Sequence, residues 1–434
     1  MKKSKIILSL LIVAVMVASL FALIACDPDK PQEVELVMWA PSSAQTFYQT
    51  WADKWAEEYS KSEAAQGKTY KVIMGIMGEK DAATNLIQME GDGPDLLCFA
   101  NDQIDDLLAA NLLSPLGNPD NDNATLAKDI AARNTAGSVA TAKGKDGNLY
   151  AFPMQADNTF YLFYDSSVLT ADDVKTWDSL FAAVDKYNAD NSTEYGVQID
   201  LGDPWYQSSF FLSFGGQVNS TQSNFGTDEV GLRAFKALHQ FALHSALKVV
   251  PANDLGKEFN KSSQKIVAGV GGSFVYTEVM ADNPDVKVAV LPKIVYEQQE
   301  YTMVPFLGSK LIGINAMAGE RIPAARSLAN YLTGEEVQLD KMVKLAAGPS
   351  NINVANSDQA KQSELTQVLA TQALYSVAQS NLPGGYWEAI KTPVNAVRTG
   401  VTSEKYKYYK DGVYDDVALR ELLTNMMSAI TFDK

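Results

Sequence analysis

The sequence predicts an α/β protein made of two lobes. The chain has 434 residues, which is more than one hydrophobic core usually serves and enough for two. Strand and helix patterns alternate as β-α-β-α-β over the first part of the body, which is typical of an α/β lobe. Hydrophobic residues make up 46% and charged residues 20% of the chain, a globular balance.

The first lobe begins with a strand over 34–40, followed by a helix for which Ser42 or Ser43 is the expected N-cap. Aromatic residues at a spacing of four on this helix predict packing against the core, because such a stripe forms one helix face. A strand over 69–76, a helix over 81–90 and a strand over 96–100 come next. The aromatic stripe consists of Phe47, Trp51, Trp55 and Tyr59.

The stretch GDGPDLLCFAND, 91–102, contains two glycines that precede the strand. Phosphate-binding glycines would follow a strand and open a helix, so a phosphate site is excluded here. Phe99 and Asp102 stand at the carboxyl end of the strand, where open α/β sheets bind ligands. Asn101 or Asp102 is also a candidate cap for the helix that follows.

The rest of the chain continues the mixed pattern. Thr176 is the expected N-cap of a helix that ends near Asn188. Strands are expected over 149–154, 195–199, 286–292 and 306–315, and 265–276 should form a strand, a Gly-Gly turn and an aromatic segment. The stretch DPWYQSSFFLSFGG, 203–216, crowds aromatic residues beside an acid, and the chain from 322 onward is largely helical in pattern.

The N-terminus has the layout of an export signal. Three lysines precede an apolar run over 6–24, which ends in LIAC, residues 23–26. A single anchoring helix is one interpretation, because the run is near spanning length. The other is a signal peptide over 1–25, cut before Cys26. LIAC resembles the lipobox of bacterial lipoproteins, which implies a lipid on Cys26, a polar tether over 26–33 and a protein held on the membrane outside the cytoplasm.

Several function classes are excluded by composition. The net charge of −16 makes nucleic acid an unexpected partner, because nothing would offset phosphate repulsion. Cys98 lies in an apolar run and is expected to be a buried, inert thiol. The two histidines, His239 and His244, are five residues apart and would not share a helix face, so neither a histidine metal site nor a catalytic triad is expected. We expect no cofactor, no metal and no catalytic residue.

Six segments together resemble a known family. They are GDGPDLLCFAND, YAFPM, KTWDSL, DPWY with its closing GG, VAVLPKI and GGYWEAIKTPVNAVRTG, and they span about residues 33–430. In this order, behind a lipobox, they are similar to the extracellular solute-binding proteins of ABC importers, family 1, and most of all to the maltose and maltodextrin binders. The resemblance implies a two-lobed periplasmic-binding-protein-like fold (type II) with crossover hinge strands and no enzymatic activity.

The resemblance also implies the lobe boundaries. One lobe would hold 34–157 and 306–356, and the other 158–305 and 357–434, with crossings near Asp157, near Pro305 and after Asn353. The lobes would close on an oligosaccharide and deliver it to the permease subunits of an importer. We expect a monomer.

The same resemblance implies a set of ligand-binding residues. In maltose binders, aromatic rings cover the apolar faces of the sugars and charged groups bind their hydroxyls, which is what a desolvated pyranose ring requires. The corresponding positions in this chain are Phe99, Asp102, Asp157, Asp203, Trp205, Tyr206, Phe274, Trp387 and Lys391.

Each assignment has an alternative. The aromatic residues could belong to the core, Asp102 could cap a helix and Lys391 could be a solvated helix residue. The chain also departs from the family, because Ser43, Ala44 and Gln103 stand where maltose binders carry an acid and two cations. Two other functions therefore remain open, namely a lipid-anchored glycoside hydrolase and the same fold binding a non-sugar solute.

Overall fold

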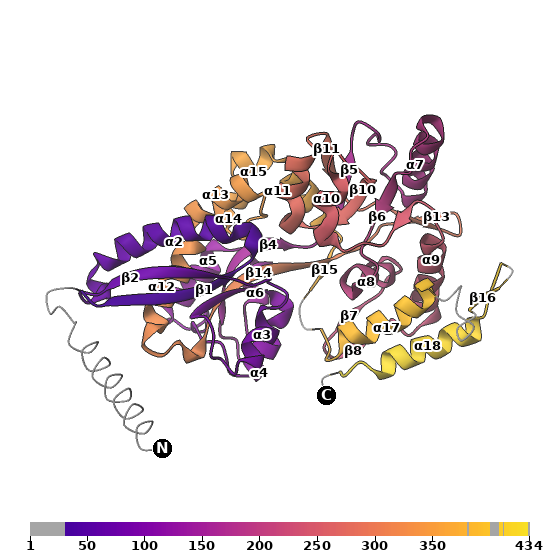
Figure 1. Cartoon of the computed structure of the whole chain (residues 1–434). Coiled ribbons are helices and arrows are strands. Elements are labelled where there is room, and N and C mark those ends of the chain that lie inside the picture. The colour runs from indigo at the N-terminus through magenta and orange to yellow at the C-terminus, as the bar shows by residue number, and fades with distance from the viewer. Residues whose placement is uncertain (1–30, 380–381, 400–407, 411, 433–434) are drawn as a thin grey trace, which may run out of the picture.

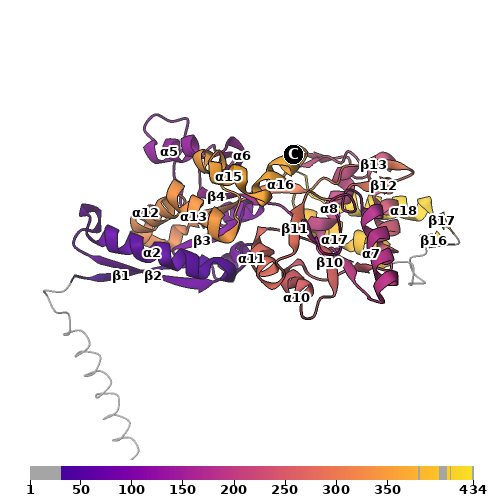
Figure 2. The same cartoon turned by 90° about the horizontal axis from the view of Figure 1, so that it is seen from above.

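The computed structural model describes residues 31–379, 382–399, 408–410 and 412–432. Two lobes lie side by side and are joined by strands that run between them (Figures 1 and 2). Cys26 and the signal segment 1–25 lie outside the described residues, as does most of the tether. Within the described ranges, no helix is long and apolar enough to cross a membrane.

The N-terminal lobe is built on a six-stranded sheet of order β15-β14-β3-β1-β2, with β4 paired to β14. Strand β1 is parallel to β2 and β3, whereas β14 runs antiparallel to β3 and β4. The strands are β1 (Glu33–Ala40), β2 (Thr69–Ile76), β3 (Leu96–Ala100), β4 (Ala151–Asn158), β14 (Phe306–Ile314) and β15 (Val377–Ala378). The helices are α2 (Gln45–Ser60), α3 (Ala82–Gln88), α4 (Ile104–Ala109), α5 (Thr125–Arg133), α6 (Ala136–Thr141), α12 (Ile322–Leu332), α13 (Glu335–Leu345) and α14 (Ile352–Ala355).

The C-terminal lobe is built on a five-stranded sheet of order β11-β5-β10-β6-β9. Its strands are β5 (Tyr161–Asp165), β6 (Gly196–Gln198), β9 (Leu247–Lys248), β10 (Ile266–Gly271) and β11 (Val286–Ala289). Its helices are α7 (Trp177–Asn191), α8 (Pro204–Ser213), α9 (Arg233–Ala242), α10 (Leu255–Phe259), α11 (Ser273–Asp282), α16 (Glu364–Ala373), α17 (Tyr386–Thr399) and α18 (Asp416–Ser428), and α15 (Asp358–Gln362) leads into α16.

Short hairpins complete the C-terminal half of the chain. They pair β7 (Val218–Asn219) with β8 (Gln222–Ser223), β12 (Ile294–Tyr296) with β13 (Gln299–Tyr301) and β16 (Tyr409–Lys410) with β17 (Val413–Tyr414). Each has only two or three residues per strand, so these pairs decorate the lobe and do not extend its main sheet.

Each lobe has its own hydrophobic core. One large cluster runs from Leu36 to Met154 and resumes from Leu311 to Val337, whereas the other runs from Phe160 to Phe306 and resumes from Leu365 to Ile430. The chain therefore passes between cores beside Asn158, near the start of β14, and between α13 and α16. Because β4 continues almost directly into β5, the crossovers are short, and short crossovers permit relative motion of the lobes.

The structure bears on the predicted strands, helix caps and buried cysteine. Strands over 69–76 and 96–100 are confirmed, and so is Thr176, whose side chain forms a capping box with Ser179 at the start of α7. The helix after β1 is not capped by Ser42 or Ser43, because those residues form a 3-10 turn and Ala44 precedes α2. Cys98 is fully buried, as expected.

Candidate functional site

The residues that face each other across the lobes come from four separate elements. Asp102 lies in the 3-10 turn that follows β3 in the N-terminal lobe. Trp205 and Trp387 are the second residues of α8 and α17 in the C-terminal lobe. Gln379 comes directly after β15, the strand that pairs with the start of β14. The carboxyl end of β3 and two helix starts thus converge on one place.

Gln379 is the centre of this cluster. It is 3% exposed, and its Oε1 accepts a hydrogen bond of 2.9 Å from Trp205 Nε1. Its backbone carbonyl accepts a hydrogen bond from Asn101 Nδ2, and Asn158 Nδ2 lies 3.4 Å from Oε1. One amide therefore contacts both lobes. Gln379 could not be predicted from the sequence, because an isolated glutamine after a two-residue strand carries no recognisable signal.

Asp102 is an acid held in an unfavourable place for its charge. Burial raises its pKa to about 6, although hydrogen bonds from the side chains of Gln379 and Trp387 lower it in part. Its Oδ1 is buried and has no hydrogen-bond partner. Asp102 does not cap a helix, since neither the 3-10 turn nor α4 has a side-chain cap. A buried acceptor without a donor is suited to binding a hydroxyl group.

The two tryptophans pack against aromatic residues of the lobe core in T-shaped contacts. The ring of Trp205 meets Phe160 edge-on at 4.8 Å between centroids, and Trp387 meets Phe306 at 5.8 Å. Both indoles remain partly exposed. Asp203 fixes the position of Trp205, because it caps α8 and its Oδ1 accepts the Trp205 backbone N–H at 2.9 Å. Helix starts therefore present both rings at the lobe interface.

Three of the expected site residues lie elsewhere. Phe99 is fully buried in the core of the N-terminal lobe, so its assignment as a ligand-facing ring is corrected. Tyr206 is 2% exposed and packs on Phe160 at 4.5 Å, behind Trp205. Lys391 is 45% exposed and lies 3.6 Å from Glu388 on the surface of α17.

Asp157 and Phe274 lie beside a second part of the interface. Both oxygens of Asp157 are occupied, by the Gly348 backbone N–H at 2.7 Å and by Gln155 Nε2 at 3.0 Å. Asp157 thus links the crossover to the loop after α13 by hydrogen bonds. Phe274 is partly exposed on α11, with Lys310 Nζ 5.8 Å from its ring centroid.

A small cavity of about 30 Å³ lies at this second part, between the lobes. The N-terminal lobe contributes polar and charged side chains, and the C-terminal lobe contributes the start of α11. The volume holds roughly one or two water molecules, so a larger ligand requires the lobes to move. Its lining residues include Ser43, Glu79, Gln155, Ser273, Phe274, Thr277, Lys310 and Lys341.

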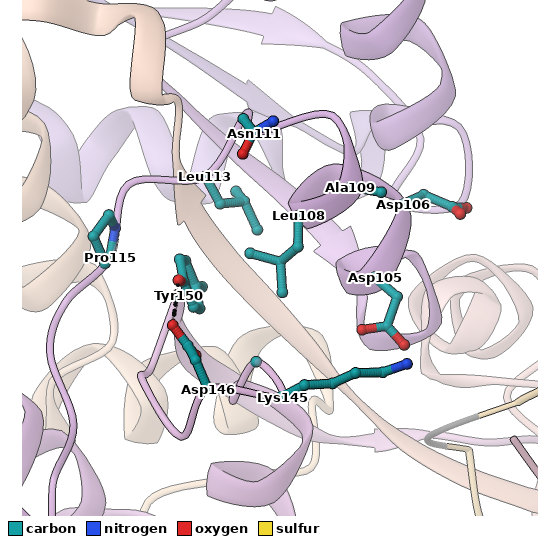
Figure 3. A pocket seen from close by; sticks show the side chains of 11 residues that line it. Asp105, Asp106, Leu108, Ala109, Asn111, Leu113, Pro115, Lys145, Asp146 and Tyr150 are labelled. Atoms are coloured by element: carbon teal, nitrogen blue, oxygen red, sulfur yellow. Dashed lines mark hydrogen bonds between the residues drawn. The ribbon is translucent and has the colours of Figure 1, made fainter. Parts of the chain in front are cut away.

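A larger pocket of about 740 Å³ lies on the N-terminal lobe (Figure 3). It is formed by α4, the segment after it and the loop around Lys145, and Tyr150 donates a 2.8 Å hydrogen bond to Asp146 within it. Every lining residue belongs to one lobe, and none is an expected site residue. This pocket therefore lies away from the lobe interface, where the expected site residues gather.

Acidic, cysteine and histidine side chains are the groups that a protein metal site requires. No group of three or more His, Cys, Asp or Glu side chains that could hold a metal occurs there. His239 is buried with Nδ1 3.1 Å from the Tyr414 hydroxyl, and His244 stacks on Phe181 at 3.9 Å. The two histidines therefore have separate packing roles.

Two lobes, short crossovers and polar and aromatic groups that meet between the lobes define a solute-binding protein. A model of the bacterial extracellular solute-binding proteins matches residues 46–367. The chain belongs to this family.

Relatives and solved structures agree with this family. The chain is 23% identical over 373 residues to the maltotriose-binding protein of Pyrococcus abyssi, covering 84% of this chain and 77% of that protein. It is 22% identical over 403 residues to the galactooligosaccharide-binding protein of Bacillus subtilis, covering 88% and 91%.

The fold is that of two-lobed sugar-binding proteins. A maltodextrin-binding protein of L. casei BL23 without ligand matches with a TM-score of 0.71 at 20% identity, over 91% of this chain and 99% of that one. A maltose/maltodextrin-binding domain of Bdellovibrio bacteriovorus bound to maltotriose has the same TM-score and coverage at 18% identity. The resemblance in fold class is therefore confirmed.

Proposed function

We propose that this protein captures an oligosaccharide between its lobes and delivers it to an ABC importer, without chemistry of its own. A maltodextrin-like chain is the first candidate. The observation that carries the proposal is the meeting of Trp205 and Trp387 from one lobe with Asp102 from the other. The names of the maltotriose-binding and galactooligosaccharide-binding relatives support a sugar ligand.

The chemistry of these groups suits a pyranose. An indole face covers the C–H face of a sugar ring, and a carboxylate accepts hydrogen bonds from hydroxyls at its rim. In the structure the Gln379 side chain donates a hydrogen bond to Asp102 and accepts one from Trp205. A sugar hydroxyl can also donate and accept, so it can make the same two contacts. The site therefore offers the two kinds of contact that an oligosaccharide needs.

A glycoside hydrolase is the second candidate, because one observation favours it. The sequence offered no acid in a setting that raises its pKa, but the structure gives Asp102 a pKa of about 6, as a general acid requires. The reaction also needs a second free carboxylate. Both oxygens of Asp157 are engaged and Oδ1 of Asp203 caps α8, so neither of these two expected site carboxylates is a free partner for Asp102. Incubation with a glycan that binds, followed by chromatography, distinguishes the two functions. A hydrolase releases shorter glycans, whereas a binding protein leaves the glycan intact.

We also propose a location and an anchor. The chain is exported, cut before Cys26 and held by a lipid at the cell surface or in the periplasm, beside the transmembrane subunits of its importer. The support is the LIAC sequence behind an apolar run and the extracellular family. The strongly acidic composition keeps the body soluble while it is anchored.

Calorimetric titration against a glycan panel tests the proposed function. The panel holds maltotriose, a galactooligosaccharide, a neutral tripeptide and a polyamine. Heat from a sugar alone, saturating at one site per chain, is the expected result. Binding of the tripeptide or polyamine with no response to any sugar contradicts a sugar ligand and favours the same fold with another solute.

A further inference from the structure

The small interlobe cavity has a concentration of positive charge that the proposed sugar contacts do not use. Lys310 and Lys341 both line it, at 6% and 5% exposure. Lys310 is compensated, since its Nζ lies 2.8 Å from Glu79 in a pair that is nearly buried. Lys341 is not compensated in this way.

The contacts of Lys341 are with neutral groups. Its Nζ donates to the Tyr48 hydroxyl at 2.5 Å and to Gln155 Oε1, and it lies 4.8 Å from the Tyr48 ring centroid. Burial lowers the pKa of Lys341 to about 8, and attraction to Glu79 and Asp157 offsets this only in part. The ammonium group remains charged at neutral pH. A buried cation without a directly bonded anion is costly, so Lys341 lowers the folding stability of the protein in this state.

The opposite wall of the cavity is the start of a helix. Ser273 is the first residue of α11, a ten-residue helix whose N-cap, Gly272, provides no side-chain hydrogen bond. The first N–H groups of a helix lack partners within it and carry partial positive charge. The Ser273 hydroxyl oxygen is buried without a hydrogen-bond partner, and the residue is 8% exposed. This wall therefore offers donors to the same small space.

We propose that this cavity is an anion subsite of the ligand cleft, and that the oligosaccharide carries a carboxylate which Lys341 and the start of α11 bind from opposite lobes. The inference rests on the proposed function and narrows its ligand to acid-bearing sugars. The carboxylate supplies the missing counter-charge for Lys341 and an acceptor for the Ser273 hydroxyl. Because these groups lie on different lobes, the acid also favours the closed arrangement.

The test compares a neutral sugar with two acidic ones on the full chain. Calorimetry uses maltotriose, maltotrionate, which has a carboxylate at its oxidised end, and trigalacturonate. At least one acid is expected to bind roughly tenfold or more tighter than maltotriose, as a charge-assisted hydrogen bond implies. Maltotriose that binds as tightly as both acids overturns the subsite and leaves the sugar site standing. A neutral tripeptide that binds when no sugar does overturns both proposals.

Variants locate the effect. Lys341→Met is expected to remove the preference for the acid and leave the affinity for maltotriose within about threefold. Lys344→Met is the matched control, because Lys344 lies on the same helix, is 60% exposed and pairs with Asp340 at 2.8 Å. Ser273→Ala removes only a hydroxyl and should weaken the acid severalfold, which covers the case in which Lys341→Met does not fold. A preference that survives in Lys341→Met, or in Ser273→Ala where Lys341→Met does not fold, overturns the subsite.

Discussion

Truncation of Trp205 and of Trp51 should separate binding from folding. Trp205 is partly exposed at the lobe interface, where its indole N–H bonds to Gln379 and its ring packs on Phe160 in a T-shaped contact. Trp51 is 5% exposed within the N-terminal core, where its indole N–H bonds to Asp340 at 2.9 Å. The same substitution to alanine therefore removes a ring that we propose to face the ligand in one case and a core ring in the other.

The expected magnitudes differ accordingly. An aromatic hot-spot residue costs about 2–4 kcal/mol of binding when truncated, so Trp205→Ala should weaken sugar binding by roughly thirty- to a thousandfold. Trp51→Ala should cost about 3–5 kcal/mol of folding free energy, a large part of the roughly 5–15 kcal/mol available to a domain. The affinity of the molecules that stay folded should remain close to that of the parent protein.

Two measurements on each variant decide the matter. Calorimetry with a confirmed glycan gives the affinity, and thermal unfolding gives the stability. Trp205→Phe serves as the conservative control, because it keeps a flat ring, although a smaller one, and loses the indole N–H; it should retain more of the affinity than Trp205→Ala. The reasoning is refuted if Trp205→Ala binds the glycan normally, or if it unfolds while Trp51→Ala does not.

Three further predictions concern charge, anchoring and motion. Because the pKa of Asp102 is raised to about 6, the folded protein binds the carboxyl proton more tightly than the unfolded chain does. Ionisation of Asp102 therefore lowers the free energy of unfolding as pH rises from about 4 to about 6, and this loss persists at higher pH. Asp102→Asn should therefore raise the unfolding temperature at pH 7 but not at pH 4, and should weaken sugar binding at pH 7; equal gains at both pH values would contradict the assignment. Cys26→Ser should leave the protein uncleaved or released into the medium, and fractionation that still finds cleaved protein on membranes would reject a lipid anchor. A saturating glycan should reduce the radius of gyration measured by solution scattering, and an unchanged radius would argue against closure about the crossovers.

The secondary structure of the first lobe was readable because its patterns are local. The local sequence pattern located β2 over 69–76, and the polar turn before an apolar run located β3, both with the observed bounds. The same run explains the error at Phe99. All five residues of β3 are buried, so the strand has no polar face from which the direction of any side chain could be inferred. A resemblance placed Phe99 in the site, but packing placed it in the core.

The groups that meet between the lobes were less accessible to sequence reasoning, since they are distant in the chain. Trp205 and Gln379 are separated by 174 positions, and only the fold shows that they share a hydrogen bond. The missing charges near Ser43 and Ala44 illustrate the same limit. Both positions line the small cavity, and an acidic residue and two lysines from other elements line the same cavity. Glu79 follows β2, Lys310 lies on β14 and Lys341 on α13, so no motif of adjacent residues exists. A short motif detects charged residues only where they are adjacent in the sequence. In the fold, the same charges can come from three separate elements that meet at one cavity. Under the anion-subsite proposal, the departures at 43 and 44 belong to a rearranged site, in which Lys341 alters which sugar is selected.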